Sequence, residues 1–230
     1  MIWVGILSHK ALSRKEKYTF RGEELKADSY SARLLLLSMY EKLYSRPLPE
    51  IQYTHAGKPY LLGDGEPHIS LSHSDGYSAV CLCDESPCGV DIEEPQDATR
   101  RARVGERYLS KVNYNLHYPS SECEISLYEF NTGEDISRIS TAFFPVIKEG
   151  YDNISGESGF SVFLSHYTVF ESGWTLVEAA LKCSGKGFRA FPVVSVLLER
   201  YSTLSLAARI NTESCEDKLY LSLAIGDTPS

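Results

Sequence analysis

The residue types best suited to holding phosphates and a divalent cation are concentrated between residues 57 and 93. Lys58 lies in a Gly-Lys-Pro turn, His73 lies between two serines, and Asp91 and Glu93 alternate with apolar residues. Lysine ammonium groups and hydroxyls bind phosphate oxygens, and paired carboxylates suit a hard cation. This stretch therefore predicts a phosphate site beside a metal site.

The two carboxylates follow a strand pattern in the sequence Gly-Val-Asp-Ile-Glu. Residues i and i+2 of a strand point to the same face, so Val90 and Ile92 are expected in a core and Asp91 and Glu93 on the opposite face. Neighbouring carboxylates raise each other's pKa unless a cation lies between them. On these residues alone, a metal site and a strand end facing water both stay open.

A second candidate group lies on a helix expected over residues 166–183. Glu178 and Lys182 are four residues apart, which makes them neighbours on one helix face. One interpretation is a surface ion pair worth roughly 0.2–0.5 kcal/mol. The other makes Glu178 a third metal carboxylate or a general base, with Lys182 bound to phosphate.

Hydrophobic periodicity predicts helices at 28–44, 97–110 and 166–183. Asp28 or Ser29 is expected to cap the first helix. Strands are expected at 2–7, 68–72, 77–83, 88–93, 188–198 and 218–225, with short strand pieces at 124–130 and 143–147. The weak pattern of residues 112–165 predicts a surface excursion. This order of elements predicts an α+β fold made of two halves.

Composition limits the classes of function. The chain has 230 residues and a net charge of −8, which argues against non-specific binding to nucleic acid. No run approaches the roughly 20 apolar residues that a membrane span needs, and residues 1–7 lack the features of a signal peptide. The six cysteines lack zinc or redox spacing, so we expect buried free thiols in a cytoplasmic protein.

Cations recur on one face of the helix expected at 97–110. They stand three and four residues apart: Arg100, Arg103, Arg107 and Lys111. A solvated surface and a docking surface for an acidic partner both agree with this spacing.

Together these pieces resemble one family. The chain carries, in order, Gly57-Lys58-Pro59, Leu71-Ser72-His73-Ser74, Gly89-Val90-Asp91-Ile92-Glu93, and Trp174 with Glu178, Ala179 and Lys182 followed by Gly185-Lys186-Gly187. This set resembles the 4'-phosphopantetheinyl transferases of the surfactin-synthetase type. The resemblance covers about residues 1–111 and 166–190.

The resemblance implies an activity, a fold and partners. Such enzymes transfer the 4'-phosphopantetheine moiety of coenzyme A to a serine of an acyl or peptidyl carrier protein and release 3',5'-ADP. It also implies a cytoplasmic monomer of two pseudo-symmetric α+β halves, with the site in the cleft between them. We expect an N-terminal half at 1–88 and a C-terminal half at 89–230, which contains an insertion at about 112–165.

The resemblance also implies roles for individual residues. Asp91, Glu93 and Glu178 would hold Mg²⁺ or Mn²⁺, and Glu178 is the candidate base. Lys182 and His73 would contact the phosphates of coenzyme A, while Lys58 and Ser72 would line its nucleotide pocket. Arg14 and Lys17 fall where the family places cations for the 3'-phosphate. The acidic helix of a carrier protein would meet Arg100, Arg103, Arg107 and Lys111.

The chain departs from the family pattern in two places. Val177 stands where the family usually has a lysine, and 87 residues separate Asp91 from Glu178, a longer gap than usual. These departures keep open a non-catalytic relative that binds coenzyme A or carrier protein only. A metal-dependent phosphoester hydrolase is a third reading, but the chain lacks the dense His and Asp ligands of a two-metal site.

Overall fold

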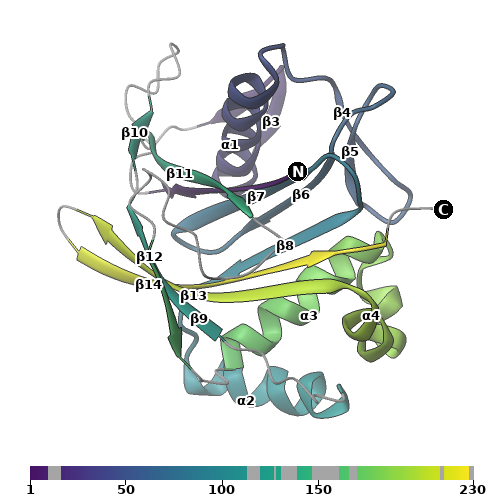
Figure 1. Ribbon diagram of the computed structural model, residues 1–230, viewed down its shortest axis with the longest axis vertical. Coiled ribbons are helices and arrows are strands. Elements are labelled where there is room, and N and C mark those ends of the chain that lie inside the picture. The colour runs from purple at the N-terminus through teal and green to yellow at the C-terminus, as the bar shows by residue number, and fades with distance from the viewer. Residues whose placement is uncertain are drawn as a thin grey trace.

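The computed structural model describes most of the chain (Figure 1). The described residues are 1–9, 17–112, 120–126, 128–130, 139–146, 161–165, 170–212 and 215–227. Within 120–165 and 206–218 only the backbone is described. Arg14 and most of the expected excursion at 112–165 therefore lie outside the described residues.

The chain alternates strands with a few helices. Its helical segments are α1 (Ala27–Tyr44), α2 (Ala98–Arg107), η2 (Leu109–Lys111), α3 (Phe170–Ser184), η4 (Gly187–Val193) and α4 (Val194–Arg200). Its strands are β1 (Ile2–Ser8), β2 (Tyr18–Phe20), β3 (Glu23–Leu25), β4 (Ile51–Tyr53), β5 (Pro59–Leu61), β6 (His68–His73), β7 (Tyr77–Cys83), β8 (Cys88–Glu93), β9 (Ser120–Ser126), β10 (Tyr128–Phe130), β11 (Ile139–Val146), β12 (Ser161–Ser165), β13 (Ser202–Thr212) and β14 (Cys215–Ile225).

Two five-stranded sheets form the centre of the molecule. The first has the order β10-β11-β1-β7-β6 and the second β12-β9-β13-β14-β8. All the pairs are antiparallel except β13 with β9, which is parallel. Helices beside largely antiparallel sheets make this an α+β structure, as the sequence predicts.

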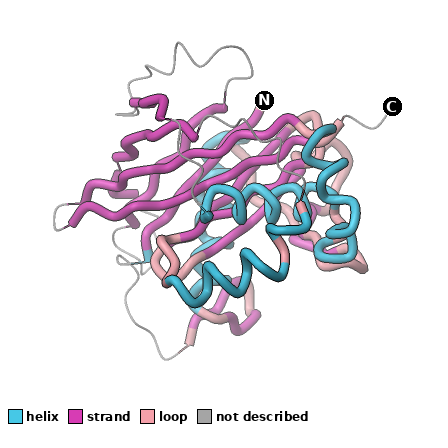
Figure 2. Tube along the Cα trace, turned by 90° about the horizontal axis from the view of Figure 1, so that it is seen from below, coloured by secondary structure: helices cyan, strands magenta, loops and turns pink. Residues whose placement is uncertain are grey.

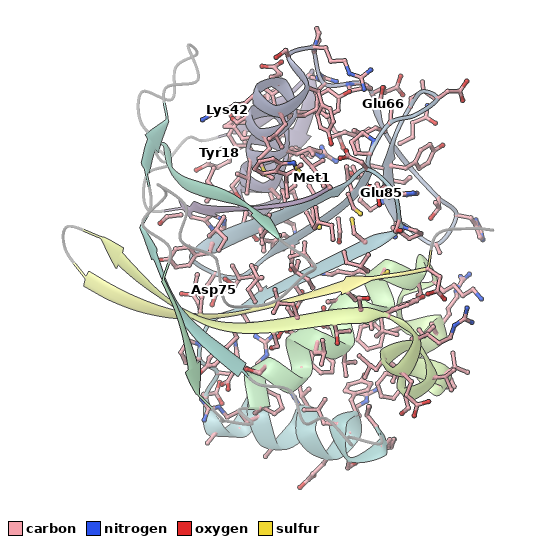
Figure 3. The ribbon with its side chains drawn as sticks, in the orientation of Figure 1. Met1, Tyr18, Lys42, Glu66, Asp75 and Glu85 are labelled. Atoms are coloured by element: carbon pink, nitrogen blue, oxygen red, sulfur yellow. The ribbon has the colours of Figure 1, made fainter. Side chains whose placement is uncertain are left out.

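The sheets face each other and enclose one core, and each carries a helix on its outer face. Side chains of β1 and β7 pack against side chains of β8 and β14 between the sheets. Figure 3 shows side chains, drawn as sticks, in the space between the two sheets. Helix α1 covers the outer face of the first sheet. Helices α3 and α4 cover the second, and Figure 2 shows the helices from that side.

The side chains of β8 alternate between the core and α3. Val90 and Ile92 lie in the core between the sheets, as predicted. Asp91 is therefore on the opposite face, toward α3, and it is also buried. Both faces of β8 are covered, so the solvent-facing strand end is the wrong alternative for Asp91.

Two local predictions are wrong. Helix α1 has Lys26 as its N-cap, with no side-chain hydrogen bond there, so Asp28 and Ser29 are inside the helix. Residues 188–198 form η4 and part of α4 and not a strand. Ala190, Val194 and Leu198 are buried at a spacing of four residues, a helical period that the general apolarity of this stretch obscures.

The remaining predicted elements are confirmed within a few residues at their ends, except that the strand expected at 124–130 is divided between β9 and β10, which lie in different sheets. Backbone pairing shows that β10 and β11, from the expected insertion, join the first sheet beside β1. Cys81, Cys83, Cys88 and Cys183 are buried free thiols. No described helix has the length and apolarity required to cross a membrane.

Candidate active site

A buried carboxylate at Asp91 joins three elements. Its side chain is 4% exposed, and its Oδ1 accepts hydrogen bonds from the Ser72 hydroxyl of β6 at 2.6 Å and the Lys182 ammonium of α3 at 2.6 Å. Lys182 also donates to the Ser72 oxygen at 2.8 Å. The ion pair of Lys182 is therefore with Asp91, and the predicted surface pair with Glu178 is not what forms.

Glu93 lies on the same face of β8 and is held by the start of α2. Its Oε1 accepts from Arg100 at 3.0 Å, and its Oε2 accepts from the Gln96 side-chain amide at 2.8 Å. Burial, followed by the negative charge of Asp91, raises the pKa of Glu93 to about 7.

Glu178 of α3 lies close enough to Asp91 and Glu93 for their charges to act on it. Burial is the main cause that raises the pKa of Glu178 to about 7, and the charges of Asp91 and Glu93 add to it. Lys182 acts in the opposite direction. Three acidic side chains from β8 and α3 thus repel one another in a largely buried site, and the Lys182 ammonium and the Arg100 guanidinium partly compensate them.

Gly89 allows α3 to approach β8 this closely. A Cβ at residue 89 would overlap the carbonyl oxygen of Ala179 and lie 2.6 Å from the amide nitrogen of Cys183. Only a residue without a side chain fits between the strand and the helix backbone. The glycine of the Gly-Val-Asp-Ile-Glu motif therefore sets the spacing between the carboxylates of β8 and those of α3.

The donor set matches a hard divalent cation in its chemistry. Asp91 Oδ2 is buried and has no hydrogen-bond partner among the described residues, and carboxylate oxygens are the ligands that Mg²⁺ prefers. As the side chains stand, however, the described residues contain no group of three or more His, Cys, Asp or Glu arranged to hold a metal ion. The Lys182 ammonium lies on Asp91 where a cation would be expected to bind.

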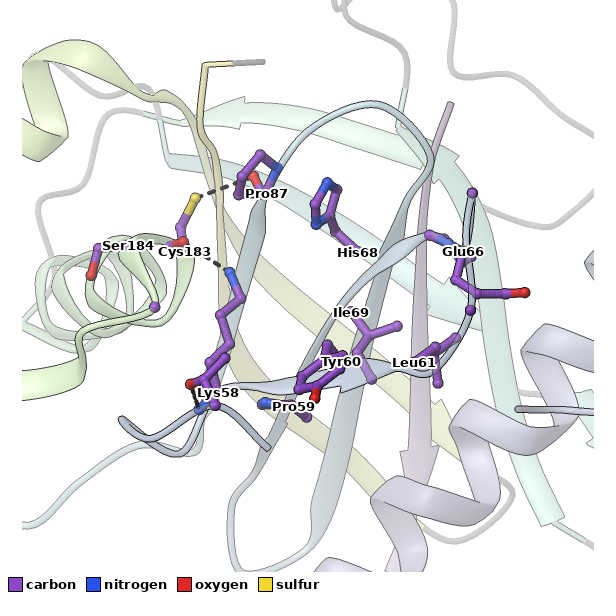
Figure 4. A pocket seen from close by; sticks show the side chains of 15 residues that line it. Lys58, Pro59, Tyr60, Leu61, Glu66, His68, Ile69, Pro87, Cys183 and Ser184 are labelled. Atoms are coloured by element: carbon purple, nitrogen blue, oxygen red, sulfur yellow. Dashed lines mark hydrogen bonds between the residues drawn. The ribbon is translucent and has the colours of Figure 1, made fainter. Parts of the chain in front are cut away.

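Lys58 connects its turn to both β8 and α3. Its ammonium donates to the carbonyl oxygen of Cys88 at 3.1 Å and to that of Cys183 at 2.8 Å. Figure 4 shows the second of these bonds. Gly57, which precedes it, has φ +85°, a left-handed conformation that favours glycine. The Gly-Lys-Pro turn is thus fastened to the C-terminal end of α3, where the helix dipole favours a cation.

Two cavities adjoin Lys58. The larger, about 420 Å³, lies between the β4–β5 region, the loop before β6 and the end of α3. His68 and Pro87 belong to its wall (Figure 4). The smaller, about 170 Å³, is lined by Lys58 and Lys182 together with Gly57, Gly185 and Gly187. Two lysine side chains and three glycines in the wall of a small cavity are suited to an anion, although both ammonium groups, as they stand, are bonded to protein oxygens.

The other predicted ligands lie apart from these groups. His73 lines neither cavity, and its Nδ1 lies 3.9 Å from Asp28 Oδ2 at the exposed end of β6. Lys17 pairs with Glu24 at 2.9 Å. Arg14 is outside the described residues.

The predicted cation stripe divides into two parts. Arg100 is paired with Glu93, so it belongs to the carboxylate site. Arg103, Arg107 and Lys111 are exposed, and none forms an ion pair with a described residue.

Sequence reasoning missed several supporting residues. Gln96 holds Glu93, and Arg101 pairs at 2.7 Å with the fully buried Glu171, which fixes α2 against α3. Ser70 accepts from the Val90 amide at 3.0 Å. The alternation of Ser70 and Ser72 along β6 was the signal that both reach β8; no pattern marked the others.

Comparison with known proteins finds four curated relatives named as 4'-phosphopantetheinyl transferases. One from Bacillus subtilis is 36% identical over 59 residues, which are 26% of this chain and 25% of the relative. The transferase AcpT of Escherichia coli O157:H7 is 37% identical over 70 residues, 30% of this chain and 33% of the relative.

The transferase Sfp of Bacillus subtilis (strain 168) is 27% identical over 84 residues, 36% of each chain. The chain thus matches a quarter to roughly a third of the length of these relatives. No family model matches the chain. The predicted resemblance to this class of transferase is confirmed.

Proposed function

We propose that this protein transfers the 4'-phosphopantetheine moiety of coenzyme A to a serine of an acyl or peptidyl carrier protein, releasing 3',5'-ADP. The observation that carries the proposal is the meeting of Asp91, Glu93 and Glu178 with Lys182, next to two cavities lined by Lys58. The proposal includes a cytoplasmic monomer whose partners are coenzyme A and the carrier protein, without nucleic acid or membrane.

The cavities offer room and charge for coenzyme A. The larger cavity is within the range of about 300–1,000 Å³ that is typical of ligand pockets, and it accepts the adenosine part. Lys58 and Lys182 in the smaller cavity donate to phosphate oxygens. Ser72 holds Lys182 from the side of β6. We also propose that His73, Arg14 and Lys17 contact the phosphates from the first half of the chain.

Asp91, Glu93 and Glu178 would hold Mg²⁺ or Mn²⁺. When bound, the ion supplies neutralisation of the negative charge on the pyrophosphate and on the leaving 3',5'-ADP. The chain's own contribution is position: β8 and α3 are held together at Gly89, and Gln96 and Arg100 orient Glu93. Phosphoryl transfer depends mainly on such positioning and charge stabilisation.

Glu178 is the proposed general base. The carrier serine loses a proton as its oxygen attacks the β-phosphorus, and a carboxylate within hydrogen-bond range, directly or through water, accepts it. In the ligand-free protein, burial raises the pKa of Glu178 to about 7, so this carboxylate holds a proton more readily than an ordinary glutamate does. Lys182 donates to the phosphate while the bond to 3',5'-ADP breaks.

A binding-only relative is the second candidate. The observation in its favour is that the described carboxylates do not form a complete metal-ligand group. Val177, which stands where the family usually has a lysine, is fully buried in the core formed by α3 and its neighbours.

One assay separates the candidates. Apo acyl carrier protein or apo peptidyl carrier protein is mixed with a fluorescent coenzyme A and MgCl₂, and covalent label on the carrier is measured by mass spectrometry. Transfer that is lost in Glu178→Ala supports the transferase. Binding of coenzyme A without any transfer to either carrier favours the binding-only relative.

A further inference from the structure

An aromatic cluster connects three helical segments on the outer side of the second sheet. Its members are Tyr108, Trp174, Phe188 and Phe191, and the ring centroids of its contacting pairs are 5.3–6.3 Å apart. Trp174 is nearly buried, whereas Phe188 is 50% exposed. A large aromatic ring that packs on a buried floor and still faces solvent is typical of an interaction site.

The cluster is surrounded by cations. The guanidinium of Arg107 lies 5.2 Å from the Tyr108 ring centroid, and Lys186 and Arg189 flank Phe188 in the sequence. Arg103 precedes Arg107 by one helical turn. These four side chains are exposed, and none forms an ion pair with a described residue.

This local charge opposes that of the whole molecule. Residues 97–111 hold five cationic and two anionic side chains, and residues 186–200 hold three cationic side chains and one anionic side chain. The full chain, in contrast, has 23 cationic and 31 anionic side chains. Solubility does not require a positively charged region on a negatively charged protein. Such a region favours the approach of an acidic partner.

The cluster also lies close to the carboxylate site. Arg100, near the start of α2, donates to Glu93, and Tyr108 of the aromatic cluster directly follows the end of this helix. The helical rise places Arg107 about 10 Å farther along the axis than Arg100. On α3, Trp174 precedes Glu178 by one turn. A protein docked on the cluster can therefore present a side chain to Glu178.

We propose that the aromatic cluster, with Arg103, Arg107, Lys186 and Arg189 around it, is the docking surface for the acidic helix of the carrier protein, and that Phe188 is its anchor. The inference rests on the proposed function for the identity of the partner. It differs from the cation stripe expected from the sequence, because Arg100 is committed to Glu93 and the anchor is an apolar ring contributed by η4. The acidic helix supplies negatively charged partners for these cations, and an apolar side chain on the same helix covers Phe188.

The test uses the full chain with apo acyl carrier protein and apo peptidyl carrier protein. The test variants are Phe188→Ser and Lys186→Glu/Arg189→Glu. Leu62→Ser is the matched apolar control, since Leu62 is also 50% exposed but lies on the loop after β5. Lys26→Glu, before α1, is the charge control. Binding to each carrier is measured by calorimetry, and the KM for carrier and the KM for coenzyme A are measured separately.

We expect both test variants to weaken binding to the carrier and to raise its KM at least about tenfold, with the KM for coenzyme A and kcat within twofold of the parent. The controls should match the parent. Circular dichroism and thermal melts confirm folding, which Phe188→Ser should keep because half of the ring is already exposed.

The results separate the two levels of the proposal. If the parent transfers label and both test variants keep the parental carrier KM, the docking surface is wrong and the transferase stands. If the parent binds a carrier but transfers no label, and Phe188→Ser abolishes the binding, the docking surface stands and the transferase is wrong. If the parent binds neither carrier but binds a single-stranded 20-mer DNA that the charge reversal releases, the carrier surface is overturned.

Discussion

The ammonium nitrogen of Lys182 lies 2.6 Å from Oδ1 of Asp91, and 91 residues separate the two in the sequence. This pair links α3 to β8, and it neutralises one of three neighbouring carboxylates. The same aspartate keeps a second oxygen, Oδ2, that is buried and has no described partner. Lys182 thus compensates the site in the ligand-free protein, while Asp91 keeps one oxygen free to bind a cation.

Removing this compensation should destabilise the fold. Lys182→Met leaves Asp91 buried without an opposite charge, and we expect a loss on the order of 2–3 kcal/mol in the free energy of unfolding, less than for a fully buried pair because the lysine is partly exposed. Urea denaturation at pH 8 measures this loss. The double variant Asp91→Asn/Lys182→Met should recover most of it; a double variant as unstable as the single one contradicts the account.

The ionised form of Glu178 should itself be a source of instability. Its pKa of about 7 exceeds the ordinary 4.5, so the folded protein loses stability as pH rises from 4.5 through 7. Without divalent cations at pH 8, Glu178→Gln should therefore have a free energy of unfolding a few kcal/mol higher than that of the parent, and a higher melting temperature. The difference should shrink by pH 4.5, and the same variant should lose transferase activity. Equal melting temperatures at pH 8 count against this electrostatic description.

The contact at Gly89 should not tolerate a methyl group. We expect Gly89→Ala to destabilise the protein by roughly 1–3 kcal/mol, because the added Cβ forces the α3 backbone away from β8. The matched control is Gly105→Ala in α2, where the nearest atom is 3.9 Å from the added Cβ. That change should be neutral or stabilising. Thermal melts of both variants decide the matter, and a neutral Gly89→Ala refutes the close approach.

His9 should make stability depend on pH. Its Nδ1 donates to the Asp75 carbonyl at 3.2 Å, and its Nε2 lies 2.9 Å from the hydroxyls of Ser31 and Ser78. Burial lowers the pKa of His9 below 6.5, although the nearby Asp28 and Glu94 act against this. The stability that the neutral ring contributes is present above pH 6.5 and is lost as pH falls through the lowered pKa.

The His9 prediction is checked by the difference between two stability profiles. His9→Gln should flatten the fall in the free energy of unfolding between pH 7 and pH 5 relative to the parent. Replacing the exposed His55 by Gln is the control and should leave the profile as it is. A parental slope in His9→Gln would show that the pKa of His9 does not differ between the folded and unfolded states.

Local patterns predicted most elements and the identity of the acidic residues. The alternation of Gly89 to Glu93 placed Val90 inward and Asp91 on the other face, because a strand has a period of two. The spacing of Glu178 and Lys182 placed them on one helix face. The prediction of a strand at 188–198 was wrong, because an apolar run of that length is compatible with both a strand and a helix.

Tertiary contacts were beyond such patterns. Nothing near Lys182 in the sequence indicates that its ammonium reaches Asp91 and not Glu178, because that choice depends on how α3 packs on β8. The aromatic cluster likewise combines Tyr108 with Phe188, from segments 80 residues apart. The pKa of Glu178 follows from burial that only the folded chain creates.

The most direct measurement is covalent transfer from a fluorescent coenzyme A to an apo carrier protein in the presence of MgCl₂, observed by intact-protein mass spectrometry. The account predicts one phosphopantetheine added on one carrier serine, loss of transfer with EDTA, and loss of at least about a hundredfold in rate in Glu178→Ala. Unchanged transfer by Glu178→Ala, or no transfer to either class of carrier by a parent protein that binds coenzyme A, would contradict it.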